Sequence, residues 1–273
     1  MRFLSRHRSV ITVDELAEAV ANRRPISGNS VILTFDDGYL DNLTVVAPIL
    51  AKYGLPAILY LCTGYVARGE NQWSDRLYTA LRNRTIDHVS LPGLPVVDLR
   101  DAQQRGFFNR SLGEHLIRNA GDRSDLLSEV ERQLAPKNER RRLTLQWDEV
   151  RQLKSQFPQF ELGIHTSDHV DLTAVEESCA LEEISKSASE FKAELGYAPR
   201  HFSYPYGRRT ESVTRRLGEL GVVSAVGESG VVSIESSDPF ALPRLLAPRS
   251  KALFRLWTSS AHPDTSLAFL GRA

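Results

Sequence analysis

The feature that most constrains the fold of this chain is a continuous apolar run, SVILTF (residues 30–35), which ends directly in Asp36 and Asp37. An apolar run without alternating polar residues is typical of a parallel strand that is buried on both faces of a sheet. Gly38 follows the two acids and permits a tight turn. One Asp here can cap the next helix, but this leaves its neighbour unexplained, because an unpaired charge at the end of a buried strand is costly.

Strand-like and helix-like segments alternate along the rest of the chain. Further strands are predicted at residues 56–62, 161–165, 201–204 and 222–227, and helices at 15–23, 40–53, 175–195 and 210–220. Thr12 and Glu15 have the spacing of a capping box before the first helix, and Pro48 predicts a kink or a late start in the second. This alternation predicts a parallel sheet covered by helices, either open and doubly wound or closed into a barrel. Neither GxGxxG nor GxxxxGK[ST] occurs, which weakens a nucleotide-binding interpretation.

Residues 65–145 interrupt this alternation of strands and helices. They are rich in Arg, Asn and Asp and carry short apolar bursts such as WSDRLYTAL (73–81). We interpret them as a mainly helical insertion within a single domain that spans residues 1–273. The basic run KNERRR (137–142) is interpreted as a solvated helix end or loop rather than a phosphate site, because the chain as a whole is neutral.

Composition limits the classes of function. The 273 residues include 34 Lys and Arg and 34 Asp and Glu, so the net charge does not indicate nonspecific electrostatic binding to nucleic acid. Two cysteines, Cys62 and Cys179, are too few for a disulfide framework and are predicted to be buried free thiols. No apolar run approaches the roughly 20 residues that span a bilayer, and the basic N-terminus lacks the apolar core of a secretory signal. We therefore expect a cytoplasmic protein without an integral membrane segment, with an upstream truncation left open.

Two histidines in HTSDH, His165 and His169, are four residues apart and follow an apolar strand. On a helical turn this spacing places both imidazoles on one face, although hydrogen-bonded histidines are the commoner cause of such a pair. Here a separate strand supplies adjacent carboxylates, and parallel strands direct their C-terminal ends toward one site. Two His and one carboxylate with open positions fit a catalytic divalent metal such as Zn²⁺. One Asp would then bind the ion, and the other would accept a proton from the activated water.

The motifs TFDDGY (34–39), HTSDH (165–169) and YPYG (204–207), in this order, resemble those of the NodB-homology polysaccharide deacetylases, carbohydrate esterase family 4. The likeness covers about residues 10–250 and is weakest over 65–145. It implies an α/β fold, a distorted (β/α)7-type barrel with the helical insertion. It also implies a bound divalent metal, usually zinc with cobalt or nickel as alternatives, and removal of an N-acetyl group from an amino sugar. Members associated with exopolysaccharide or lipopolysaccharide biosynthesis look most similar.

The resemblance assigns roles to individual residues. Asp36 matches the general base of the family motif, and Asp37, His165 and His169 match the Asp-His-His metal triad. Tyr206 matches the tyrosine whose backbone N–H stabilises the tetrahedral oxyanion, which is a large source of rate in acyl hydrolysis.

Supporting roles and departures follow from the same comparison. Thr166 would orient the metal-binding loop, and Asp168 would be a hydrogen-bonding partner of a ligand histidine. Many relatives carry an arginine that orients the base where this chain has Ser203. Arg244 is the candidate replacement and is assigned to the catalytic group, with a structural ion pair to Asp238 as the alternative.

Two family features are missing. The late Leu-x-His motif that carries the general acid is not evident, and His262, in SAHPDT, has a different setting. The proton for the leaving amine is therefore assigned jointly to protonated Asp36 and to water at the metal. Relatives also often have a strand before the first helix, which would lie upstream of Met1 and imply a shortened barrel or a truncated start.

These residues imply a metal-dependent N-deacetylase acting on an amino sugar of a polysaccharide or glycolipid precursor, with Asp36 as the base. One alternative is a deformylase or amidase that acts on another N-acylated sugar or small amide. Another is a non-catalytic carbohydrate-binding relative, which the missing late histidine and Ser203 favour and the intact base and triad oppose. Trp73 and Tyr78 could stack on a sugar ring, although core packing is the commoner use of such residues.

Overall fold

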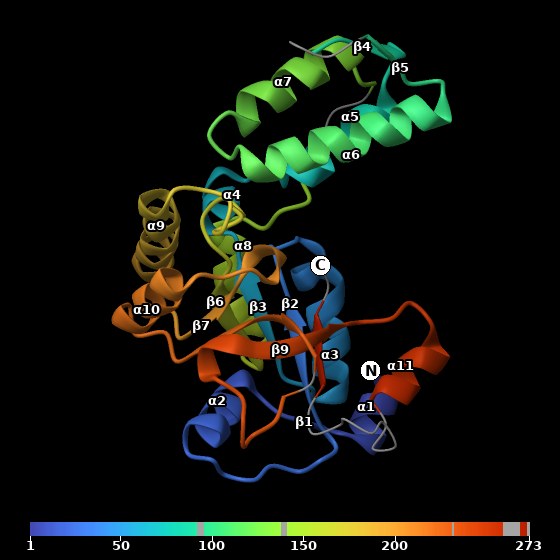
Figure 1. Cartoon of the computed structure of the whole chain (residues 1–273). Helices are drawn as coiled ribbons and strands as arrows, with labels where there is room; N and C mark the ends of the chain where they lie inside the picture. The colour runs from blue at the N-terminus through green and yellow to red at the C-terminus, as the bar shows by residue number, and fades with distance from the viewer. Residues whose placement is uncertain (92–95, 138–140, 231, 259–267, 272–273) are drawn as a thin grey trace.

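Parallel strands form a closed ring in this computed structural model, which describes residues 1–91, 96–137, 141–230, 232–258 and 268–271. In that part of the chain, seven strands pair side by side, and β2 contacts both β3 and β10, which closes the ring. The strands of the ring are β2 (Ser30–Phe35), β3 (Ala57–Leu61), β6 (Phe160–Ile164), β7 (His201–Ser203), β8 (Ser224–Ser229), β9 (Leu242–Leu246) and β10 (Ala268–Gly271). The expected distorted (β/α)7-type barrel is confirmed (Figure 1).

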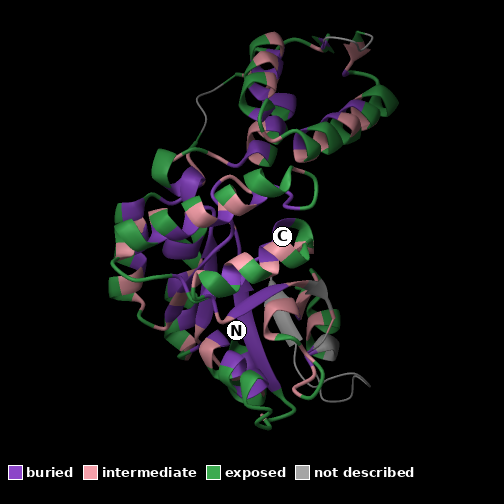
Figure 2. Cartoon of the chain, turned by 60° about the vertical axis from the view of Figure 1, so that its left-hand side comes forward, coloured by how far each residue is buried: buried purple, intermediate pink, exposed green. Residues whose placement is uncertain are grey.

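The strands are buried and the helices cover them. All five residues of β3 are buried, as are five of the six in β2, because helices pack against the outer face of the sheet. Leu50, Val150 and Ile184 carry this contact from three different helices. Figure 2 shows the buried strands in purple among helices that are exposed on their outer sides. The helices around the barrel are α1 (Arg2–His7), α2 (Val13–Ala21), α3 (Ala47–Tyr53), α4 (Thr63–Arg68), α8 (Trp147–Gln156), α9 (Glu177–Leu195), α10 (Glu211–Glu219) and α11 (Lys251–Trp257).

Local signals in the sequence set the helix limits. Thr12 and Glu15 form a reciprocal capping box at the start of α2. Pro48 stands in the first turn of α3, where its missing N–H costs no helical bond, and a π-helical turn (Asn42–Val46) precedes it. Gly54 ends α3 in the left-handed conformation, with φ of 61°.

A separate group of helices lies beyond one end of the barrel (Figure 1). It consists of α5 (Trp73–Asn83), α6 (Ala102–Arg118) and α7 (Arg123–Leu134), with a short antiparallel pair formed by β4 (His88–Val89) and β5 (Val97–Asp98). These elements share their own apolar core, which includes Leu77, Phe108 and Leu127. An ion pair between Arg76 and Glu131 (3.0 Å) joins α5 to α7.

The fold corrects two expectations. A short strand, β1 (Ser9–Val10), pairs with the start of β2, so a strand precedes the capped helix α2 within this chain. Cys62 is buried as expected, but Cys179 is exposed, because it lies on the outward face of the first turn of α9. Both thiols are free.

Some expectations fall outside the described residues. His262 is one of these, as are residues 138–140 of the basic run. Of the helices in the described part of the chain, none combines the length and apolar character needed to cross a bilayer.

Candidate active site

The predicted site residues gather where the strands of the barrel end. Asp36 follows β2, His165 follows β6, Tyr206 follows β7, and Arg244 lies within β9. Together with Asp37 and His169, they line one cavity of about 520 Å³. Because parallel strands direct their carboxyl ends to the same side, residues far apart in sequence meet there.

The Asp37 carboxylate lies near both histidines of the HTSDH loop. The Nε2 atom of His169 lies 3.6 Å from Asp37 Oδ1, and that of His165 lies 3.9 Å from the same oxygen. Ligand atoms around a tetrahedral zinc ion lie about 3.4 Å apart, given bonds of about 2.1 Å. Burial lowers the pKa of both histidines, which favours the neutral imidazole that binds metals. Asp37, His165 and Cys62 have ligand atoms within 4.8 Å of one another, a spacing that could hold a cation. His169 approaches the same Asp37 oxygen, so Asp37 and the two histidines are the candidate ligands.

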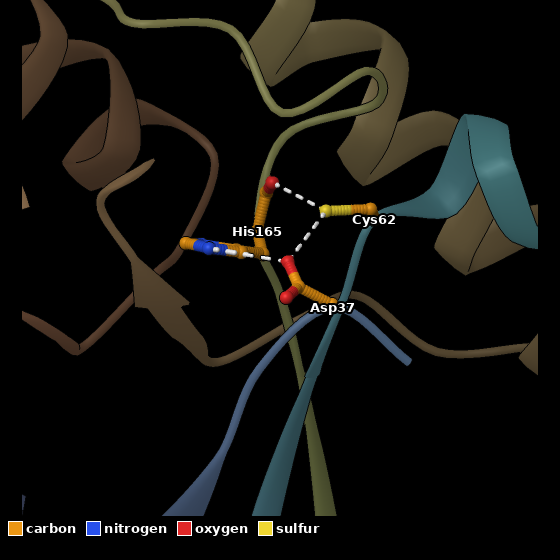
Figure 3. A group of neighbouring side chains, drawn as sticks. All are labelled: Asp37, Cys62 and His165. Carbon is orange, nitrogen blue, oxygen red and sulfur yellow. Dashed lines mark hydrogen bonds and ion pairs between the residues drawn. The ribbon is translucent and has the colours of Figure 1, made fainter. Parts of the chain in front are cut away.

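Cys62 lies beside this cluster and was not foreseen from the sequence. Its Sγ atom lies 3.7 Å from Asp37 Oδ1 and 3.3 Å from the carbonyl oxygen of His165 (Figure 3). Burial, reinforced by the nearby Asp37, raises the pKa of the Cys62 thiol, so it is a proton donor to these oxygens. Its position directly after strand β3, at the same end of the barrel as Asp37, was the signal that could have identified it.

Asp36 is held as a carboxylate by Arg244. Arg244 Nη1 donates to Asp36 Oδ1 (2.9 Å), while Nη2 donates to Asp36 Oδ2 and to Ser203 Oγ (2.9 Å). Burial alone would raise the pKa of Asp36, but the charges of Arg244 and His165 outweigh it, and the pKa is lowered. The ion pair with Asp238 is absent: the Asp238 carboxylate accepts from the Phe240 N–H instead. In this structure Arg244 is thus the arginine that orients Asp36, and Ser203 accepts a hydrogen bond from it.

The pKa of Asp37 is shifted in the opposite direction to that of Asp36. Burial raises its pKa to about 7, and the neighbouring charge of Asp36 adds to the effect. Two adjacent buried carboxylates favour one ionised and one protonated group. A cation beside Asp37 Oδ1 would reverse this balance.

Tyr206 has two contacts with the site. Its hydroxyl lies 3.2 Å from His169 Nδ1, and the two rings meet edge to face. Burial raises the pKa of Tyr206 to about 12, partly offset by Arg123 and by hydrogen bonding to Trp73. Its backbone is left-handed (φ 58°), and within the described residues its N–H has no acceptor. This amide is therefore available to a ligand.

The HTSDH loop differs in one respect from expectation. The Asp168 carboxylate does not contact a histidine but pairs with Arg68 and with Lys186 (3.1 Å), because the side chain points outward toward α4 and α9. Thr166 is buried in a left-handed conformation (φ 64°), and its carbonyl accepts from the Thr63 N–H.

The helical insertion forms part of the cavity wall. Trp73 and Gln72 line it, and Gln72 Nε2 lies 3.5 Å from Asp37 Oδ1. Trp73 is also buried in the core of the insertion, whereas Tyr78 is 59% exposed and packs in no core. Trp73 thus lies both in a core and at the cavity, as the two sequence-based interpretations of it allowed, whereas no sequence pattern indicated the contact of Gln72 with Asp37.

Known proteins place these features in one family. The chain matches the family described as polysaccharide deacetylase over residues 23–225. YxkH of Bacillus subtilis, described as a polysaccharide deacetylase, is 28% identical over 90 residues, which cover 31% of this chain and 32% of YxkH. The chain therefore matches about a third of the length of that relative.

Solved structures share the fold. The Streptococcus pyogenes deacetylase PplD, in complex with acetate, has a TM-score of 0.60 at 16% identity and covers 94% of this chain and 81% of its own. IcaB from Ammonifex degensii has a TM-score of 0.58 at 18% identity, covering 93% and 84%. The BpsB deacetylase domain from Bordetella bronchiseptica has a TM-score of 0.53 at 14% identity, covering 99% and 83%. With the family match extending over most of the sequence, this chain belongs to the polysaccharide deacetylase family.

Proposed function

We propose that this protein is a metal-dependent hydrolase that removes the N-acetyl group from an amino sugar of a polysaccharide or glycolipid precursor. One observation carries the proposal. Asp36 is a buried carboxylate that the partly buried Arg244 keeps ionised, and it lies 3.9 Å from His165 Nε2, beside the candidate metal ligands. A general base must stand within reach of the water that it deprotonates, and this is the place where that water would lie.

The metal would be held by Asp37, His165 and His169. When bound there, a divalent cation such as Zn²⁺ supplies Lewis acidity, which acidifies water and polarises an acyl carbonyl. Neutral histidines are ready to bind, and His169 is oriented by the Tyr206 hydroxyl at its other ring nitrogen.

The protein groups then divide the proton transfers. Asp36 accepts a proton from the attacking water, while Arg244 and Ser203 hold its carboxylate in place. The Tyr206 N–H donates to the oxygen on which negative charge develops in the tetrahedral transition state. Asp36 then returns the proton to the nitrogen of the leaving amine, so that acetate and a free amino sugar result.

The cavity suits a sugar substrate. Its volume of about 520 Å³ is within the usual range for small-ligand sites. Trp73 and Tyr206 supply aromatic surface, which sugar rings stack against, beside the polar groups that carry out the reaction.

Acetate release from N-acetylglucosamine oligomers and from lipid-linked N-acetyl sugars tests the proposal. We expect release that depends on zinc, stops with a chelator and recovers when zinc is added back. Protein purified without a chelator should contain zinc. Absence of metal from such protein would contradict the proposal, and release of formate but not acetate from matched substrates would redirect it to a deformylase.

A further inference from the structure

We propose that Arg123, in the helical insertion, is a positioning residue that fixes His169 at the proposed metal site. It acts through two sets of contacts, one with the Asp168 carbonyl and the other with the Trp73–Tyr206 pair. This inference rests on the proposed metal site. It makes the insertion a working part of the active site rather than an appended layer.

Arg123 is a buried cation without a carboxylate partner in the described part of the chain. It is the first residue of α7, and only 5% of its surface is exposed. Its Nε donates to the Leu116 carbonyl (2.9 Å), and Nη1 donates to the Asp168 carbonyl (2.9 Å). Nη2 has no hydrogen-bond partner among the described residues. Since burying a charge costs several kcal/mol, an arginine placed here needs a reason beyond stability.

The first route runs through the main chain. The Asp168 carbonyl belongs to the peptide bond that leads into His169, so Arg123 fixes the orientation of that peptide. His169 has φ of 51°, a left-handed conformation that is strained for a residue other than glycine. Such a conformation persists only where the surroundings hold it.

The second route runs through aromatic side chains. The Arg123 guanidinium lies 5.6 Å from the centre of the Trp73 ring, within the range of a cation–π contact. The Trp73 side chain hydrogen-bonds to the Tyr206 hydroxyl, and that hydroxyl lies 3.2 Å from His169 Nδ1. A second partner on the far nitrogen fixes the tautomer and ring direction of a metal-binding histidine.

The other side chains that hold the HTSDH loop come from helices around the barrel. Glu183 of α9 accepts hydrogen bonds from the N–H groups of Ser167 and Asp168, and Arg68 of α4 pairs with the Asp168 carboxylate. Among the described residues of α5, α6 and α7, Arg123 is the one arginine that reaches the loop. Docking of α7 on the barrel is thereby linked to the geometry of one metal ligand.

The test measures how long the zinc-loaded protein keeps its metal. The rate of zinc transfer to a colorimetric chelator is compared for the wild type, Arg123→Ala and Arg123→Lys. Loss of a group that orients a metal ligand typically costs about 10–100-fold in affinity, so Arg123→Ala should release zinc about tenfold faster. Lys at this position keeps the charge but cannot reach both carbonyls, and should fall between the two.

Arg76→Ala is the matched control. Arg76 is a poorly exposed arginine of the same insertion, but it pairs with Glu131 and does not touch the loop. It should release zinc at the wild-type rate even where it lowers the thermal unfolding midpoint. Combining Arg123→Ala with Tyr206→Phe should be less than additive, because both variants act on His169.

Two results would overturn the inference. One is that folded Arg123→Ala and Arg123→Lys keep zinc as long as the wild type does. The other is that Arg76→Ala releases zinc as fast as Arg123→Ala, which would make the effect one of insertion stability. A wild type that binds no zinc would overturn the proposed function as well, so the two failures are distinguishable.

Discussion

Arg244 of β9 and Asp36 at the end of β2 are 208 residues apart in sequence, yet their side chains form an ion pair joined by two hydrogen bonds, with the carboxylate buried. The pair links β9 to the end of β2, and Arg244 also donates a hydrogen bond to Ser203 on β7. A base that is both ionised and fixed in direction results from three strands, and no one segment could provide it.

Replacing Arg244 should weaken the base without removing it. In Arg244→Gln the burial of Asp36 is no longer opposed by a cation, so the pKa of Asp36 rises. The acid limb of the kcat/KM profile should therefore move to higher pH. Loss of one partner of a buried ion pair should also lower the free energy of unfolding by about 3–5 kcal/mol.

The control for this variant is Arg200→Gln. Arg200 is exposed and pairs with Asp14 rather than with any residue of the cavity (2.9 Å). Its pH profile should match the wild type. An unchanged acid limb in Arg244→Gln would show that Arg244 does not govern the ionisation of Asp36.

Replacing Asp36 separates chemistry from metal binding. Asp36→Asn should lower kcat by about 10²–10⁴-fold, the usual contribution of a general base, while zinc stays bound. Asp37→Asn should instead lose the metal, because Asp37 is the proposed oxygen ligand. Measuring acetate release and zinc content on both variants distinguishes the two roles, and equal zinc loss from both would contradict the assignment.

The strand-end residues could be predicted because each stands directly after an apolar run, as Asp36 and His165 do. That Arg244 joins Asp36 could only be a candidate, since sequence spacing does not tell which strands become neighbours in a closed ring. Arg123 could not be predicted at all. Its function depends on how the insertion packs on the barrel, which no sequence periodicity encodes. The direction of the Asp168 side chain is equally absent from the sequence, so its pairing with Arg68 and Lys186 rather than with a histidine could not be predicted.

Metal removal should make stability depend on pH in a particular direction. Without a cation, the pKa of Asp37 in the folded protein is about 7, above its ordinary value of 3.8. A raised carboxyl pKa gives stability that is complete below about pH 4 and is lost as pH rises through about 7. Chelated protein should therefore lose stability over this range, and zinc-loaded protein should lose less.

Urea unfolding at pH 5.5 and pH 8, with and without a chelator, measures this effect. Asp37→Asn is the control, since it removes the titrating group and should remove the extra loss on chelation. If chelated wild type and chelated Asp37→Asn show the same change between the two pH values, then Asp37 does not cause it.

A second pH effect should come from the opposite end of the barrel. His201 is buried at the start of β7, with Nδ1 on Ser224 Oγ (2.8 Å) and Nε2 on Asp14 Oδ1 (3.0 Å). Burial lowers its pKa to about 4 from 6.5, so the folded state favours the neutral ring. The unfolded chain binds the proton first as pH falls, and the free energy of unfolding should drop by about 3 kcal/mol between pH 7 and pH 4.

Wild type and His201→Gln are compared by urea unfolding across this range, with exposed His115→Gln as the control. The slope should shrink in His201→Gln alone, and an equal slope in all three proteins would contradict the assignment.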